Sequence, residues 1–303
     1  MPFINPKYNM KEIHTLAEEL QEKIKQATEH PHGLSGISSG FDEIDMLTSG
    51  WQKGDLIVVA GNPFMGVRAF LLSLIQPMIL ENNHLVTFFS PLKSNAYLIQ
   101  RMLFTACEME RSKVLNSSIS IEEKQQLDFY LEKFKDAMII WDDSFPNTIQ
   151  NIRDSITYLC KDKELCTDLI VIDRFDLLID PDKRSKLEME KALLELKGLA
   201  KEFNVPVIVS TYYPQKEFAV NDIEIMRPSF TDLFDIELFD FVDVTCFIFR
   251  PEYYKIIEDE DGNDTLGIAE IIISKNIGGT GKIRLKFNPR IGEYFPIETN
   301  TKP

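Results

Sequence analysis

The sequence has few of the features that mark secreted or membrane proteins. Its 303 residues include only four cysteines, and no two of them have C-x-x-C spacing, so neither a disulfide framework nor a cysteine-ligated metal site is predicted. No apolar run approaches the ~20 residues that span a bilayer. The first residues also lack the basic start and apolar block of a secretory signal. We therefore expect a cytoplasmic protein with reduced thiols and no membrane contact.

Positive charge is also scarce in this sequence. Lys and Arg number 33 against 48 Asp and Glu, which gives a formal net charge of −15. A protein that binds the nucleic-acid backbone needs cations to displace counterions, so this balance argues against a free-standing DNA-binding protein. A local basic patch can still lie on an acidic chain. Hydrophobic residues make up 44% of the sequence, which is ordinary for a globular protein with one large domain or two.

An amphipathic helix is predicted near the start of the chain, over residues 9–29. Asn9 can cap it, apolar residues recur along it at spacings of three and four, and Gly33 follows its end. The chain is therefore predicted to divide into a linker helix, residues 1–33, and a larger domain, residues 34–303. The apolar stripe of the helix can pack either on its own domain or on a neighbouring subunit, and the pattern alone leaves both open.

The remainder of the chain alternates apolar strands with helices. Strands are predicted at 56–60, 85–89, 137–141, 169–173, 205–210, 244–249 and 271–274, with a further strand at 283–287 that could pair as a late hairpin. Helices are predicted at 67–80, 95–109, 121–135, 149–160 and 187–203. This alternation indicates an α/β fold with a mostly parallel sheet and helices on both of its faces. An acidic run at 258–264 is expected to form a mobile surface loop.

The most informative segment follows the first predicted strand and has the G-x-x-x-x-G frame of a phosphate-binding loop. Its residues are Gly61, Asn62, Pro63, Phe64, Met65, Gly66, Val67 and Arg68. Backbone N–H groups in this frame can surround a phosphate. However, Val67 stands where a Lys would contact the β- and γ-phosphates, and Arg68 stands where a hydroxyl would hold Mg²⁺. The segment therefore has the frame of a nucleoside triphosphatase without two of its chemical groups.

A second candidate for the same site is Asp173, the one metal-ligand candidate. It follows four aliphatic residues, as does the carboxylate that holds Mg²⁺ through water in phosphate-loop enzymes. Ligands of such folds collect at the carboxyl ends of the strands, so we expect Asp173 to lie near the loop. Three placements of Arg68 are then open. Its guanidinium could lie near the phosphates or the vacated metal position, it could pair with Asp173, or it could be solvated.

These motifs, taken in order, resemble the C-terminal RecA-like motor domain of DnaB-type hexameric replicative helicases. The similarity covers about residues 34–296. Beyond the phosphate loop, the matching residues include Arg101, Asp142, Asp143, Asp173, Arg227, Pro228, Asp232, Asp243, Arg250, Tyr253, Tyr254 and Lys275. The resemblance implies a RecA-like P-loop NTPase fold, ATP and Mg²⁺ as cofactors, and a ring in which the helix at 9–29 docks on the adjacent subunit. The family's separate N-terminal domain, which engages primase, is expected to be absent because only residues 1–33 precede the motor domain.

Five positions that the resemblance makes catalytic carry other residues. Two of them are Val67 and Arg68, described above. Leu92 stands where the family has the Glu that activates water, and Tyr212 where a Gln senses the γ-phosphate. Ile277 stands where an arginine finger reaches into the neighbouring subunit's site.

Two cations of the implied nucleotide site are retained, namely Arg250 and Lys275. The implied DNA-contacting loop is altered around Asp235, because Phe234 replaces an Arg and Glu237 replaces a Gly. These changes remove a cation and add an anion, so DNA binding is predicted to be weakened. The aromatic residues of this region are Phe230, Phe234, Phe239 and Phe241. They form either part of the core or a hydrophobic surface for a partner.

The combined losses predict little or no ATPase or unwinding activity. A charge-assisted contact to phosphate contributes ~1.5–3 kcal/mol, a general base ~10²–10⁴ in rate and an arginine finger ~10³–10⁵. The substitutions put the family's use of ATP and Mg²⁺ in doubt. We predict a binding, regulatory or assembly component linked to DNA replication, which forms a homo-oligomer or associates with an active helicase. The alternatives are a divergent but active ATP-dependent DNA helicase and a nucleotide-sensing module that does not hydrolyse.

Overall fold

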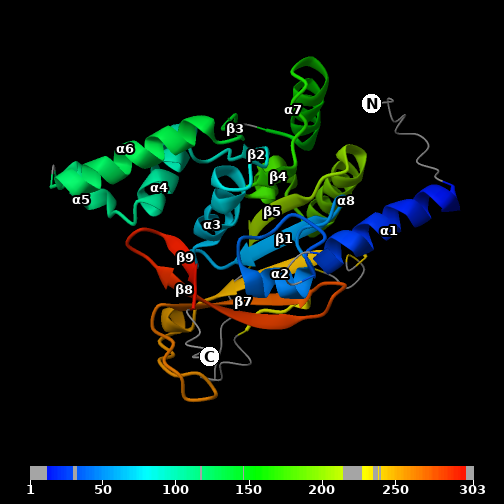
Figure 1. The fold of residues 1–303 in the computed structure, drawn as a ribbon. Helices are drawn as coiled ribbons and strands as arrows, with labels where there is room; N and C mark the ends of the chain where they lie inside the picture. The colour runs from blue at the N-terminus through cyan, green and yellow to red at the C-terminus, as the bar shows by residue number, and fades with distance from the viewer. Residues whose placement is uncertain are drawn as a thin grey trace.

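Parallel and antiparallel strands form one large sheet at the centre of the molecule (Figure 1). The computed structural model describes residues 12–29, 33–116, 118–145, 147–213, 227–234, 238 and 240–297. The strands are β1 Leu56–Gly61, β2 Val86–Phe89, β3 Ile139–Asp142, β4 Leu169–Ile172, β5 Val207–Tyr212, β6 Val244–Phe249, β7 Ile268–Lys275, β8 Gly281–Asn288 and β9 Glu293–Pro296. Their order across the sheet is β3-β2-β4-β5-β1-β6-β7-β8-β9. The first six strands in this order, from β3 across to β6, are parallel to one another. Strands β7, β8 and β9 add an antiparallel extension.

Helices cover both faces of this sheet, as the alternating pattern predicted. The helices are α1 Ile13–Glu29, α2 Asp42–Thr48, α3 Val67–Leu80, α4 Asn95–Ala106, α5 Arg111–Leu115, α6 Ile121–Asp136, α7 Ile149–Asp162, α8 Lys186–Phe203 and α10 Phe230–Leu233, with short 3-10 turns η2 Phe175–Leu178, η3 Pro181–Lys183 and η5 Pro251–Tyr254. One core cluster joins α3 to Ile57 and Val59 of β1, and a second joins α7 and α8 to Leu56 and Val58. Successive side chains of a strand point to opposite faces, so the fully apolar β1 supplies both cores.

Local sequence signals set several helix boundaries. Ser94, Ser120, Thr148 and Ser185 each accept a hydrogen bond from a backbone N–H group in the first turn of α4, α6, α7 and α8. Such caps satisfy donors that the helix itself cannot pair. Helix α8 ends at Asn204 in the left-handed conformation. The sequence prediction missed the short helices α2, α5 and α10 and the strand β9, which are 7, 5, 4 and 4 residues long.

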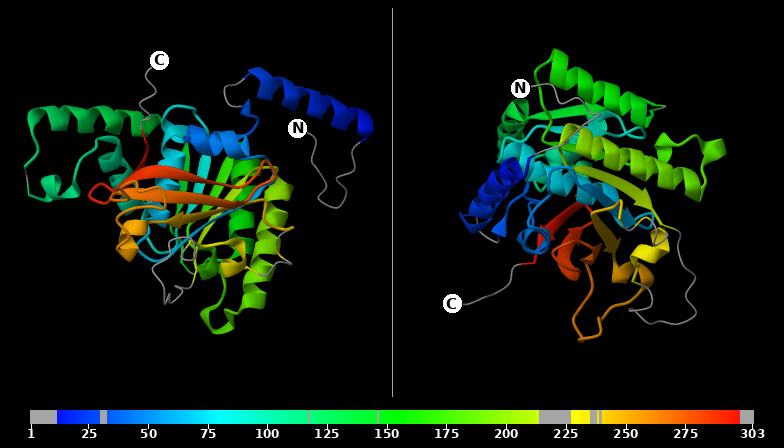
Figure 2. Two further views of the ribbon diagram at one scale, coloured as in Figure 1. Left: turned by 90° about the horizontal axis from the view of Figure 1, so that it is seen from below. Right: turned by 90° about the vertical axis from the view of Figure 1, so that its right-hand side faces the viewer.

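Helix α1 stands away from the sheet (Figures 1 and 2). Its apolar stripe is exposed at Ile13, Leu16, Leu20 and Ile24. The sequence left two placements of this stripe open. These four side chains do not pack on their own domain. The part of the predicted helix that precedes residue 12 lies outside the described residues. None of the described helices is both long enough and apolar enough to cross a bilayer.

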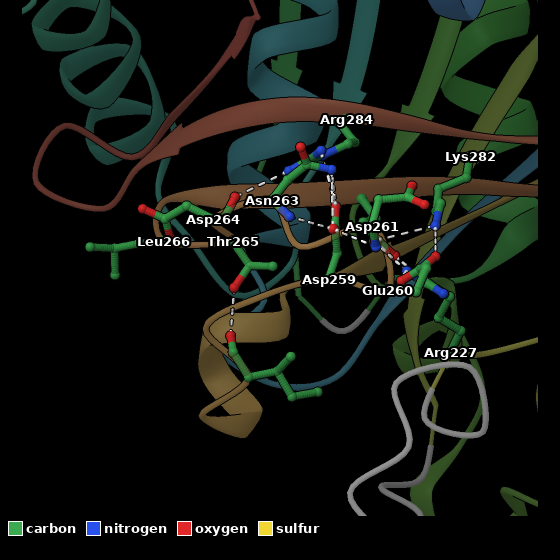
Figure 3. A network of polar contacts seen from close by, with 12 residues as sticks. Arg227, Asp259, Glu260, Asp261, Asn263, Asp264, Thr265, Leu266, Lys282 and Arg284 are labelled. Atoms are coloured by element: carbon green, nitrogen blue, oxygen red, sulfur yellow. Dashed lines mark hydrogen bonds and ion pairs between the residues drawn. The ribbon is translucent and has the colours of Figure 1, made fainter.

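The acidic run at 258–264 forms an exposed turn, as predicted, and two of its carboxylates are paired with cations (Figure 3). Glu260 accepts hydrogen bonds from Arg227 Nη2 (2.9 Å) and Lys282 Nζ (2.6 Å). Asp259 pairs with Arg284 Nη1 at 3.1 Å. The Arg227 hydrogen bond is the main cause of a lowered pKa at Glu260. The run is therefore held by two cations of β8, Lys282 and Arg284, and by Arg227, which is about thirty residues earlier in the chain.

Candidate nucleotide site

The phosphate-loop frame leaves the carboxyl end of β1 and turns sharply into α3. Phe64 and Gly66 both have positive φ angles, 72° and 88°. A Cβ atom at Gly66 would lie 2.7 Å from the hydroxyl oxygen of Tyr294. That hydroxyl donates a 2.6 Å hydrogen bond to the Met65 carbonyl oxygen. The glycine is thus required both by the backbone conformation and by the close approach of β9 to the loop.

The side chain of Val67 points into the core. Its exposed fraction is 4%. A Cβ atom placed on Gly61 would lie 2.7 Å from Val67 Cγ2, so the isopropyl group packs directly on the end of β1. The position that the resemblance assigns to a phosphate-contacting Lys is therefore filled by a packed aliphatic group.

Arg68, the next residue, forms an ion pair with Asp173. Its Nε donates to Asp173 Oδ2. Asp173 is 3% exposed, and it also accepts hydrogen bonds from Ser210 Oγ (3.0 Å) and Ser90 Oγ (3.3 Å). Both carboxylate oxygens are thus bonded to side chains of the chain itself. Of the three placements that the sequence left open for Arg68, the structure has the pair with Asp173.

Arg174, which the sequence analysis did not single out, adds a second cation to this edge. It has a left-handed backbone, φ 75°, and its N–H donates a 2.8 Å hydrogen bond to Ser210 Oγ. Its guanidinium carbon lies 4.1 Å from the ring centroid of Tyr212. Its Nε and Nη2 also donate bidentate hydrogen bonds to Asp176 Oδ1 and Oδ2, each 2.7 Å long. These bonds raise the pKa of Arg174. The only sequence signal for Arg174 is its place directly after Asp173.

Tyr212 therefore lies at the site but beneath a cation. It ends β5, where it is the register partner of Gly61 on β1. Its ring is partly exposed and is covered by the guanidinium of Arg174. A cation–π contact of this kind holds the ring in place.

Arg250 and Asn62 hold the outer side of the loop. Arg250 Nη1 donates to the carbonyl oxygen of Phe64 at 3.2 Å, and its guanidinium also pairs with Glu252. Asn62 is buried and donates a 2.6 Å hydrogen bond to the hydroxyl of Tyr254. The structure therefore places Arg250 beside the loop, as expected. Its Nη1 is bonded to the loop backbone.

The other predicted site residues do not join this cluster. Leu92 lies in the turn after β2 and is 49% exposed. Lys275 is the register partner of Thr245 near the start of β6, whereas Gly61 is beside Ile248 near its end. The Lys275 Nζ donates to the Val242 carbonyl oxygen, and burial lowers the pKa of this lysine.

Ile277 lies two residues beyond Lys275 and is fully exposed in the β7–β8 turn. Within one chain, Lys275 and Ile277 thus lie at the opposite end of the strands from the phosphate loop.

With this geometry established, the chain can be compared with known proteins. The sequence model of the DnaB-like helicase C terminal domain matches residues 36–295. The chain belongs to the DnaB-like helicase family.

Curated relatives of this DnaB-family chain extend beyond the region that matches it. A probable replicative DNA helicase of Trieres chinensis is 29% identical over 86% of this chain and 57% of the relative. The replicative DNA helicase DnaB of Geobacillus stearothermophilus is 29% identical over 95% of this chain and 62% of the relative. The chain thus spans about three fifths of the length of these relatives.

Solved structures of DnaB-like proteins share the fold. The structure described as the ATPase domain of G40P superposes with a TM-score of 0.81 at 23% sequence identity, covering 96% of this chain and all of that one. A structure of a DnaB-like replicative helicase, described together with its interactions with primase, gives a TM-score of 0.79 at 23% identity over 96% of this chain and 68% of the other. These similarities confirm the RecA-like α/β fold predicted from the sequence.

The DnaB-family loop that the resemblance assigns to DNA contact is only partly within the described residues. Phe234 is 4% exposed and packs on Phe230 with ring centroids 5.5 Å apart. The side chain of Phe234 is therefore part of the core, and the weakened DNA contact predicted for this loop stays a prediction. Asp235, Glu237 and Phe239 lie outside the described residues. Phe241 packs against the same core cluster, so three of the four aromatic residues follow the core alternative.

Proposed function

We propose that this DnaB-family motor domain does not hydrolyse ATP and serves as a binding or assembly component linked to DNA replication. The observation that carries the proposal is the ion pair between Arg68 and Asp173. It joins the two positions that hold Mg²⁺ in the family that the chain resembles. A carboxylate that is already bonded to a guanidinium and two hydroxyls has little capacity left for a hydrated metal ion.

The residues present do not fit a Mg²⁺–ATP complex. Mg²⁺ requires oxygen ligands in near-octahedral geometry. The hydroxyl that would supply one is replaced by the cation of Arg68, and the described residues contain no group of three or more His, Cys, Asp or Glu that could hold a metal. Val67 also supplies no charge to a β- or γ-phosphate, because its side chain is aliphatic, and it is packed on Gly61. We therefore assign no catalytic step to this site.

We further propose that the chain has two parts, a linker helix in residues 1–33 and a motor domain in residues 34–303, and that copies associate head to tail. The apolar stripe of α1 is exposed on one side of the molecule. Helix α6 exposes Ile121, Phe129 and Leu131 on the other side (Figures 1 and 2). Association through two different surfaces on opposite sides generates rings or filaments rather than closed pairs. This arrangement supports the ring expected from the family resemblance.

A phosphate-release assay tests the catalytic part of the proposal. Wild-type protein is expected to release phosphate from ATP at background rate, with and without single-stranded DNA. The variant with Val67→Lys, Arg68→Thr and Leu92→Glu serves as the gain-of-activity control, because it restores three of the replaced groups. DNA-stimulated turnover by the wild type that is abolished by Asp173→Ala would show instead that the site is an active motor.

Light scattering after size-exclusion chromatography tests the assembly part. We expect wild-type protein to form oligomers, and Leu20→Glu on α1 or Phe129→Glu on α6 to reduce the mass to that of a monomer. Thr15→Glu is the matched control, because it places the same charge on the polar side of α1. A wild-type mass that stays monomeric at all concentrations, or an oligomer unaffected by both interface variants, argues against head-to-tail association.

A further inference from the structure

A cavity of about 190 Å³ lies between α4, the start of α5 and the turn that joins β8 to β9. None of its lining residues belongs to the phosphate loop. Its wall includes three arginines, one from each element: Arg101 from α4, Arg111 from α5 and Arg290 from the turn. Three guanidinium groups around one hollow are unusual for a chain whose formal net charge is −15. The cavity is therefore a local concentration of positive charge on an acidic protein.

Only part of this charge is compensated within the chain. Arg101 Nη2 donates to the carbonyl oxygen of Gly292 at 3.3 Å, a neutral acceptor. Arg290 Nη1 lies 3.3 Å from Glu110 Oε1 in an exposed pair. Arg111 is exposed, and in the described part of the chain it is bonded to no carboxylate. One carboxylate, that of Glu110, thus faces three cations. Its exposed ion pair with Arg290 is weak, so a ligand that displaces Glu110 loses little binding energy.

Packing fixes the position of at least one of the guanidinium groups. Gly292 has φ 74°, and a Cβ atom built on it would collide with the Arg101 guanidinium, so the turn approaches α4 closely only because residue 292 is glycine. The hollow also has aromatic walls. Phe104 is buried, and Tyr97 is half-buried beneath the Nζ of Lys93, which lies 5.2 Å from the ring centroid. A flat apolar group could therefore lie beside the charged one.

We propose that this cavity binds the phosphate group of a nucleotide, supplied either as free nucleotide or as the end of a nucleic-acid strand. Guanidinium groups bind phosphate oxygens through two parallel charge-assisted hydrogen bonds, and a cluster of them is selective for anions with several oxygens. The site is separate from the phosphate loop and does not depend on the state of Asp173.

Isothermal titration of the full chain with inorganic phosphate and with AMP tests this site. Both should bind to the wild type, and Arg111→Ala and Arg290→Ala should each weaken binding about tenfold or more, the effect of losing a charge-assisted hydrogen bond. Arg111→Lys keeps the charge but loses the bidentate guanidinium, so it should weaken binding less than Arg111→Ala does. Arg153→Ala on α7, where Arg153 pairs with Glu202, is the matched control and should have no effect. Binding that is unchanged in both cavity variants would overturn the proposal.

Two further arms separate the sources of the phosphate and the two possible sites. Tighter binding of a 5′-phosphorylated oligothymidylate than of AMP would assign the cavity to strand ends, and equal binding would assign it to free nucleotide. The Arg68→Thr variant reports on the phosphate loop alone, because no residue of that loop lines the cavity. If Arg68→Thr abolishes phosphate binding while Arg111→Ala leaves it intact, the anion binds at the phosphate loop, and the cavity proposal fails whatever the ATPase assay shows.

Discussion

The ion pair between Arg68 and Asp173 leads to a quantitative prediction about stability. Arg68→Ala removes the cation but leaves the carboxylate 3% exposed. Removing one partner of a buried ion pair typically costs about 3–5 kcal/mol, because the other charge remains desolvated. Ser90 and Ser210 still donate hydrogen bonds to Asp173, and Arg68 itself is partly exposed. We therefore expect the lower end of this range, a loss of about 3 kcal/mol in the free energy of unfolding.

Urea unfolding of four proteins measures this effect. The proteins are the wild type, Arg68→Ala, Asp173→Asn and the double variant. Asparagine is neutral and can still accept the serine hydrogen bonds, so the double variant should be more stable than Arg68→Ala alone. The expected coupling energy between the two positions is about 0.5–3 kcal/mol, the range for residues in one ion-pair network.

Two results would refute this reasoning. The first is an Arg68→Ala variant within about 0.5 kcal/mol of the wild type, the level typical of surface substitutions. The second is strict additivity of the two single changes. Either result would mean that Asp173 is adequately solvated without Arg68 and remains available to a metal ion.

Three further predictions concern the β8–β9 region, the Figure 3 network and the loop. Burial, together with Glu108, raises the pKa of Glu293 from 4.5 to about 8, so the contribution of this carboxyl to stability is fully present below pH 4.5 and is lost as pH rises through 8. Glu293→Gln should therefore stabilise the protein by about 3 kcal/mol at pH 9 and by little at pH 4, measured by urea unfolding at both values. Arg227→Ala leaves Glu270 buried beside a network missing its main cation, and chemical denaturation should show a loss of about 3 kcal/mol, whereas a loss under 1 kcal/mol would contradict the contacts. Gly66→Ala should lower the melting temperature by several degrees, about 2 kcal/mol, because the new methyl group meets the Tyr294 hydroxyl at a positive φ, and an unchanged melting temperature would contradict this.

Most of the fold could be predicted because the strands β1, β2, β4 and β6 are buried on both faces. Such strands appear in the sequence as short, continuous apolar runs, and the helices between them have clear polar caps. Helix α3 was predicted over residues 67–80 and is found as Val67–Leu80. Strand β6 was likewise predicted over its full length. Short elements such as α2 and β9 give too little periodicity to be recognised, and their positions depend on tertiary packing.

The site was less predictable because its contacts join residues that are far apart in the chain. Arg68 and Asp173 are 105 positions apart, and the sequence could place them at one edge without deciding whether they bond. The direction of the Val67 side chain depends on the absence of a side chain at Gly61. The acidic run at 258–264 shows the same limitation, because its composition gives no sign that Arg227 lies against it.

The residues at the loop are better explained as a repacked site than as an accumulation of unrelated losses. If only the metal-binding hydroxyl had been lost, Asp173 would remain a buried carboxylate without a cation, which is strongly destabilising. An arginine at position 68 supplies that cation from within the chain. It follows that Arg68→Thr alone should not restore metal chemistry. The substitution removes the Arg68–Asp173 ion pair, but the other groups that bind a metal–nucleotide complex are still missing. Restoration has to include Val67→Lys and Leu92→Glu, since a bound triphosphate needs both its charge partner and its activated water.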